Sequence, residues 1–116
     1  MAQQPYFEVQ TLDTAPEEAL GALEGVHKKF GKIPNIIGTM ANSPVALKSY
    51  GALGANLAAA GFDPKEMQII NLTISVENDC HYCIAAHSTA LKKGMQVDAD
   101  VVATIRAKGT VNHPQW

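Results

Sequence analysis

The sequence has few charged residues and no excess of basic ones. Asp, Glu, Lys and Arg make up 17% of the 116 residues, and the formal net charge is −2. Proteins that bind nucleic acids or anionic membranes through their charge carry a basic surface, which this composition does not supply. Apolar residues make up 47% of the chain, which excludes an intrinsically disordered protein. We expect a folded protein that binds neither nucleic acid nor membrane.

Long hydrophobic runs are also missing. No stretch approaches the roughly 18 apolar residues of a membrane-spanning helix, and the N-terminus has neither the basic start nor the apolar segment of a secretory signal. We therefore expect a cytoplasmic protein. A chain of 116 residues has the usual size of one domain and buries about two-thirds of its unfolded surface. We expect a single domain over residues 1–116.

The sequence has only two cysteines, Cys80 and Cys83. A pair this close in sequence cannot staple a fold, so it gives no argument for secretion. His87 follows the second cysteine by four residues. Positions i, i+3 and i+7 lie along one face of a helix. The spacing therefore predicts a thiol pair with a base beside it.

Each cysteine has its own source of activation in this pattern. The reactive form of cysteine is the thiolate, and its pKa falls near a helix N-terminus, a histidinium or the second thiol of a C-x-x-C pair. Asn78 and Asp79 are common helix-capping types. We therefore expect Cys80 in the first helical turn, where free backbone N–H groups favour an anion. Cys83 would lie one turn deeper, with His87 placed to take its proton.

Three interpretations fit this stretch from the residues alone. The cysteines cycle between dithiol and disulfide; or Cys80, Cys83 and His87, together with His81, bind zinc or another thiophilic metal; or they are small buried hydrophobes beside a core histidine. A single C-x-x-C is compatible with redox and metal sites alike. Structural zinc usually needs a fourth ligand from a second such motif, which the sequence lacks. We favour the redox interpretation and assign no metal and no cofactor.

Residues 72–87 resemble the signature of a known family. An apolar helix, a polar turn and then C-x-Y-C-x-x-A-H are typical of the alkylhydroperoxidase D-like branch of the carboxymuconolactone decarboxylase family, and these residues match position by position. Residues 32–36 and 40–44 resemble the Pro-Asn, short helix and Ser-Pro that precede it there. The resemblance covers residues 33–94. It implies an all-α helical bundle that assembles into trimers or hexamers.

The resemblance also implies a thiol-dependent peroxidase. Cys83 would attack a hydroperoxide with His87 as general base, Cys80 would close the disulfide, and an external dithiol or disulfide reductase would reduce it. The reverse order of the two cysteines stays open. Family members with this activity carry a glutamate of a proton relay twelve residues before the first cysteine, where this chain has Gln68. Because glutamine can hydrogen-bond but cannot shuttle a proton near neutral pH, either the relay is weaker here and Gln68 only holds a hydrogen-bond position, or Glu77 replaces the glutamate.

Two further residues of the motif are assigned to the surroundings of the thiols. Tyr82 stands where some peroxidase members have a histidine, and we expect it in the pocket wall. His81 is expected to be exposed. The alternative activity is decarboxylation of a lactone acid, which gives the family its name but does not need the cysteine pair. A non-enzymatic Cys/His metal-binding module is the third option.

Capping residues, prolines and glycines predict six helices, preceded by an irregular arm over residues 1–14. The helix before the thiols is apolar nearly all round, so we expect it to be buried and to enclose them in a small, dry pocket. Family members usually continue with further helices, which are missing from this sequence. We expect the helix faces that those helices would cover to be exposed in the subunit, and we therefore expect an oligomer. The expected helices run from a Thr14 cap to Gly31, over 36–42, from a Ser43 cap to Gly61, from an Asp63 cap to 76, from Cys80 to Gly94 and from Asp98 to 107.

Overall fold

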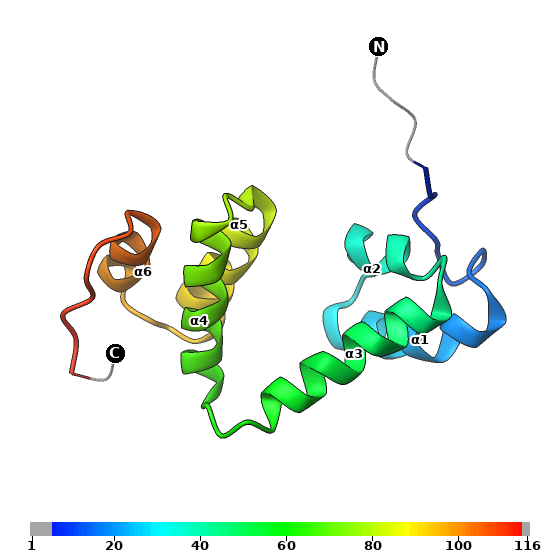
Figure 1. Cartoon of the computed structure of the whole chain (residues 1–116), viewed down its shortest axis with the longest axis horizontal. Coiled ribbons are helices and arrows are strands. Elements are labelled where there is room, and N and C mark those ends of the chain that lie inside the picture. The colour runs from blue at the N-terminus through cyan, green and yellow to red at the C-terminus, as the bar shows by residue number, and fades with distance from the viewer. Residues whose placement is uncertain (1–5, 115–116) are drawn as a thin grey trace, which may run out of the picture. The chain divides into compact units, whose positions relative to one another are not determined.

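The computed structural model describes residues 6–114, and every regular element in that range is a helix. This part of the chain forms six α-helices and one π-helical turn, and Figure 1 labels the α-helices along the chain. The predicted all-α fold is confirmed. None of these helices is both long enough and apolar enough to cross a membrane. The elements are α1 (Glu17–Phe30), α2 (Asn35–Met40), α3 (Pro44–Ala58), α4 (Pro64–Glu77), α5 (His81–Thr89), η1 (Ala90–Gly94) and α6 (Ala99–Arg106).

The chain forms two compact units, divided at the end of α3 between Leu57 and Ala58. The first unit contains α1, α2 and most of α3, and the second contains α4 to α6. Each unit has a hydrophobic core of its own. The expectation of a single domain stays a prediction. All the residues of the thiol motif belong to the second unit.

The core of the first unit is built by one face of each of its three helices. Residues 1–5 of the predicted arm lie outside the described residues, whereas residues 8–10 pack on α2: the backbone N–H of Gln10 donates to the carbonyl of Gly38 at 3.0 Å. The side chain of Asn42 donates to the carbonyl of Glu8 at 2.7 Å, which holds the arm at a second point. The buried residues are Ala19, Leu23, Ile37, Ala41 and Leu47.

The start of α1 differs from the prediction. Pro16 occupies the N-cap position, and no side chain caps the helix. The predicted cap, Thr14, is wrong because its hydroxyl accepts a hydrogen bond from the backbone N–H of Thr11 at 2.9 Å and closes a turn before the helix. The predicted end is confirmed, since Gly31 takes the left-handed conformation with φ 73°.

The second unit begins with the predicted cap. Asp63 accepts from the backbone N–H groups of Lys65 and Glu66, and the Glu66 side chain accepts from the backbone N–H of Asp63, so a complete capping box starts α4. The helix is less buried than its sequence suggested, since Ile74 is 53% exposed. One side of α4 packs into a core with η1 and α6. Its buried residues are Leu72, Val76, Leu91, Val97, Val101, Val102 and Ile105.

Candidate active site

A tight turn joins α4 to α5 and carries the first cysteine. The backbone N–H of Cys80 donates to the carbonyl of Ser75 at 3.0 Å, and that of Asp79 donates to the carbonyl of Val76 at 3.2 Å. This pair of bonds is the Schellman motif that ends many helices. Asp79 takes φ 51°, a left-handed conformation that Asp and Asn tolerate better than most residues. The turn therefore ends α4 immediately before Cys80.

This geometry corrects the predicted caps of the thiol helix. Asn78 is the C-cap of α4, and Asp79 is needed for its left-handed turn, so neither begins α5. Cys80 itself is the N-cap, and its Sγ accepts a hydrogen bond from the backbone N–H of Cys83 at 3.3 Å. Cys80 lies one position before the first turn. Its sulfur still contacts the helix N-terminus, through its own capping bond.

The two cysteines form a disulfide, with their Cα atoms 5.3 Å apart. Both residues are half-buried. The expectation that two buried helices enclose the thiols in a small, dry pocket stays a prediction. Among residues 6–114, no three His, Cys, Asp or Glu side chains gather as a group that could hold a metal ion.

The histidine of the motif is held by α4. The Nδ1 atom of His87 lies 2.7 Å from the Oε1 atom of Gln68. A side-chain amide oxygen only accepts hydrogen bonds, so Nδ1 carries the proton and the neutral ring keeps its lone pair on Nε2. His87 is half-buried, and this burial lowers its pKa below the ordinary value. The ring is thus a neutral base with one nitrogen fixed.

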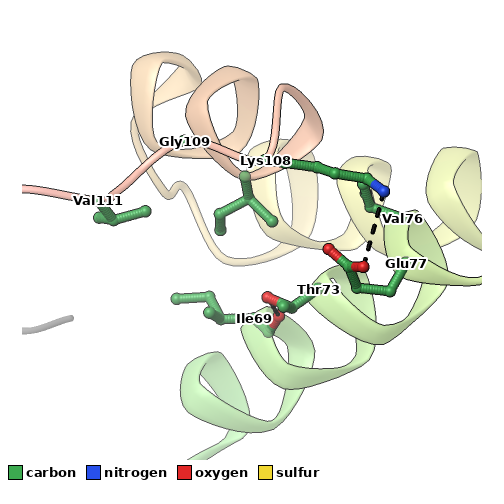
Figure 2. Close-up of a pocket in the computed structure, with 8 residues that line it drawn as sticks. Ile69, Thr73, Val76, Glu77, Lys108, Gly109 and Val111 are labelled. Carbon is green, nitrogen blue, oxygen red and sulfur yellow. Dashed lines mark hydrogen bonds and ion pairs between the residues drawn. The ribbon is translucent and has the colours of Figure 1, made fainter.

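The candidate replacement for the family's glutamate does not reach this histidine. The carboxylate of Glu77 lies 3.6 Å from the Nζ atom of Lys108, an ion pair drawn in Figure 2. The structure brings together Gln68 and His87, and in the described part of the chain it places no hydrogen bond between Glu77 and His87. Gln68 occupies the position next to His87 that Glu77 was expected to fill.

The two remaining residues of the motif lie on the outside. His81 is exposed, as expected. Tyr82 is 64% exposed. The pocket-wall role of Tyr82 stays a prediction.

The sequence model of the carboxymuconolactone decarboxylase family matches residues 44–112, which is more than half of the chain. The chain belongs to the carboxymuconolactone decarboxylase family. The matched region begins with α3 and includes all of α6, so it extends further toward the C-terminus than the predicted resemblance did. It contains Gln68, both cysteines and His87, whereas residues 32–43 fall outside it. This family includes enzymes. No curated protein matches the sequence.

One residue within the family region was missed by sequence reasoning. No role was predicted for Lys108, yet its ammonium group pairs with Glu77 of α4. The only signal in the sequence was a lysine directly before Gly109 at a helix end. That signal predicts a turn but not the partner on another helix.

Proposed function

We propose that the protein is a thiol-dependent peroxidase of the alkylhydroperoxidase D-like branch, which cycles Cys80 and Cys83 between dithiol and disulfide. The observation that carries this proposal is the contact between Gln68 and His87 at 2.7 Å. It fixes a neutral imidazole four residues after Cys83, next to a cysteine pair that is close enough to form a disulfide. A lone C-x-x-C would not distinguish redox chemistry from metal binding.

In the proposed cycle, the Cys83 thiolate attacks one oxygen of a hydroperoxide. A sulfur–oxygen bond forms, the O–O bond breaks, and an alcohol or water leaves after taking a proton. Cys83 becomes a sulfenic acid, which Cys80 attacks to give the disulfide and water. An external dithiol supplies two electrons and two protons and restores both thiols. Such reductants keep thiols reduced in the cytoplasm, where we place the protein.

His87 serves the first step as general base. Its Nε2 atom takes the proton of Cys83 and returns it to the departing oxygen. Gln68 is a positioning residue: its carbonyl holds Nδ1–H but cannot receive that proton. The proton therefore travels only between Cys83, His87 and the leaving group. A negative charge is also absent at position 68, so no carboxylate opposes the burial that lowers the pKa of His87 in the disulfide form.

The reverse order of the cysteines has one observation in its favour. The Sγ atom of Cys80 accepts a hydrogen bond from the backbone N–H of Cys83, and this bond would stabilise a thiolate at Cys80. Single variants separate the two orders. With Cys80→Ser, a sulfenic acid trapped on Cys83 supports the proposed order. Rapid trapping on Cys80 in Cys83→Ser, with none on Cys83 in Cys80→Ser, reverses it.

The decisive experiment measures the rate of thiol loss with hydrogen peroxide and cumene hydroperoxide across pH. We expect the wild type to form the Cys80–Cys83 disulfide after one equivalent of peroxide, as read by mass spectrometry. His87→Ala should slow oxidation by roughly 10²-fold or more, the usual effect of a general base. His81→Ala is the matched control, because this exposed histidine lies in the same stretch. Slow oxidation that is equal in all three proteins would overturn the proposal.

We also propose that the subunits form a homo-oligomer, as a trimer or hexamer. Tyr50, Leu53 and Leu57 are spaced i, i+3 and i+7 along α3 and are 51%, 57% and 46% exposed. An apolar stripe of this kind is typical of a contact between subunits. Analytical ultracentrifugation tests it: Leu53→Asp should dissociate the assembly, whereas Lys48→Asp, an exposed change on the same helix, should not. A monomeric wild type would contradict the proposal.

A further inference from the structure

A cavity of about 260 Å³ lies between α4 and the C-terminal part of the second unit (Figure 2). It is separate from the candidate active site, because Gln68, His87 and the two cysteines are not among the residues that line it. Small-molecule sites usually measure about 300–1,000 Å³, so this cavity suits a ligand at the small end of that range. The lining residues are Ile69, Thr73, Val76, Glu77, Ile105, Lys108, Gly109 and Val111.

The cavity has an aliphatic wall and a polar rim. Four of its residues have branched aliphatic side chains, and none is aromatic. The polar groups are the hydroxyl of Thr73 and the charged ends of Glu77 and Lys108, which Figure 2 shows drawn toward each other at one end. Thr73 donates its hydroxyl proton to the carbonyl of Ile69 at 2.8 Å. Toward a ligand, Thr73 therefore offers an acceptor.

Lys108 takes an unfavourable backbone conformation at the edge of this cavity. Its N–H donates to the carbonyl of Ile105 at 3.0 Å, and that of Gly109 donates to the carbonyl of Thr104 at 2.9 Å, so α6 ends in a Schellman motif. Lys108 occupies the left-handed position with φ 56°, where glycine is usual. This conformation holds the lysine stem beside the cavity.

Stability does not explain a lysine at this position. The side chains of Lys108 and Glu77 are 53% and 62% exposed and 3.6 Å apart, and ion pairs so accessible to water add little net stability. The left-handed backbone opposes folding as well. Strained residues of this kind often serve a binding site. The pair is thus better explained by a ligand that uses both charges.

We propose that this cavity binds an α-amino acid with a branched aliphatic side chain, such as leucine. The ligand's carboxylate would pair with Lys108, and its ammonium would pair with Glu77 and donate to the hydroxyl of Thr73. One ion pair of the free protein becomes two in the complex. The aliphatic side chain of the ligand leaves water to contact Ile69, Val76, Ile105 and Val111.

The two charges on the rim make the site selective for a zwitterion. A simple carboxylate that binds Lys108 leaves Glu77 without its partner, and a simple amine that binds Glu77 leaves Lys108 without its partner. Either ligand gains one ion pair and loses another. The zwitterion alone leaves every charge paired. Selectivity between these three ligands is therefore the property that distinguishes this site from a nonspecific apolar groove.

NMR titration of the oxidised protein tests the proposal without any peroxide, so its outcome is independent of the peroxidase proposal. Leucine should cause saturable shifts in the amides of the lining residues. The matched probes are 4-methylpentanoate, which lacks the ammonium, isopentylamine, which lacks the carboxylate, and glycine, which lacks the side chain. Each should bind at least about tenfold more weakly than leucine, a difference worth about 1.4 kcal/mol.

Three variants complete the test. Lys108→Gln and Glu77→Gln should each weaken leucine binding by about tenfold or more and leave amide shifts elsewhere unchanged, since both side chains are more than half exposed. Lys92→Gln is the control, because this exposed lysine lies outside the cavity. The proposal is overturned if leucine gives no saturable shift, if the singly charged probes bind equally well, or if Lys108→Gln binds like the wild type.

Discussion

Gln68 and Glu77 lie nine residues apart on α4 and therefore face opposite directions. At about 3.6 residues per turn, nine residues make roughly two and a half turns. Gln68 contacts His87 on α5, whereas Glu77 contacts Lys108 beyond α6. One helix thus supplies a neutral partner to the histidine of the thiol site and a charged partner to the rim of the aliphatic cavity. No rotamer change moves Glu77 to the position of Gln68.

Replacing Gln68 by glutamate should raise the pKa of His87. A carboxylate that accepts from Nδ1–H favours the charged imidazolium, in opposition to the burial that lowers the pKa in the wild type. NMR titration of the His87 ring measures the change. Glu77→Gln is the control and should leave the titration unaltered, since it lies on the other side of α4. An identical His87 titration in Gln68→Glu and wild type would mean that the two side chains do not touch in solution.

The stability of the oxidised protein should fall as the pH drops below neutrality. The pKa of His87 is lower in the folded protein than its ordinary value, which is about 6.5 in an unfolded chain. The unfolded chain therefore binds the proton first, and the free energy of unfolding decreases from about pH 6.5 down to the folded-state pKa. A difference of one in pKa between the folded and the unfolded chain corresponds to about 1.4 kcal/mol in the free energy of unfolding.

Urea unfolding at pH 7.5 and 5.5 measures this loss. His87→Gln should remove that part of the pH dependence. The control His27→Gln should not, because His27 is exposed on α1. If acid lowers the free energy of unfolding equally in the wild type and in His87→Gln, then protonation of His87 does not cause the loss of stability.

Gly38→Ala should destabilise the first unit by about 1–3 kcal/mol, the range for overpacked sites. A Cβ atom at this position would lie 2.6 Å from Cγ1 of Val9 and 2.7 Å from the carbonyl oxygen of Gln10. The second of these atoms is backbone and cannot move without breaking the contact of the arm with α2. Chemical denaturation measures the change.

The matched control for Gly38 is Gly21→Ala in α1. A Cβ atom at Gly21 has no neighbour within 4 Å, so the higher helix propensity of alanine should stabilise the protein by up to about 1 kcal/mol. Opposite signs for the two substitutions are the expected result. Stabilisation by both would show that the arm does not pack on Gly38 in solution.

Lys108→Gly should stabilise the protein while it abolishes leucine binding. Glycine adopts the left-handed conformation at no steric cost, and relief of a non-glycine residue there is worth about 1–2 kcal/mol. The lost ion pair removes at most about 1 kcal/mol. Thermal unfolding and NMR titration on one sample measure both effects. A destabilised Lys108→Gly would show that the ion pair with Glu77 outweighs the backbone strain, against the reasoning that assigns Lys108 to a ligand.

The helices could be predicted from the sequence because their boundaries depend on local chemistry. Asp63 and Pro64 start α4, and Gly31 ends α1, through contacts made within a few residues of each position. The same approach failed where one residue type serves two purposes. Asn78 and Asp79 favour helix caps and left-handed turns alike, and the bonds to Ser75 and Val76 decide for the turn.

Contacts between helices were harder to predict. The motif predicted His87 beside the cysteines, but its partner was expected to be Glu77 and is Gln68. Glu77 was expected to be the relay residue because its carboxylate can carry a proton, whereas the amide of Gln68 cannot. The direction in which Glu77 points, however, depends on where α6 and Lys108 pack. The division of the chain near Leu57 likewise follows from which apolar faces meet. The periodicity of apolar residues shows that a helix has an apolar face, but it does not identify the helix that packs against that face.

The cap of α5 is a sulfur atom, and this has a consequence for chemical labelling. The Sγ atom of Cys80 accepts the N–H of Cys83 and is also the atom that an alkylating reagent modifies. A carbon substituent on that sulfur makes it a poorer and bulkier acceptor, so labelling removes the bond that starts the helix. Reagents used to count free thiols would thus loosen the first turn of α5. Labelling rates at Cys80 report the opening of this turn as well as the oxidation state of the pair.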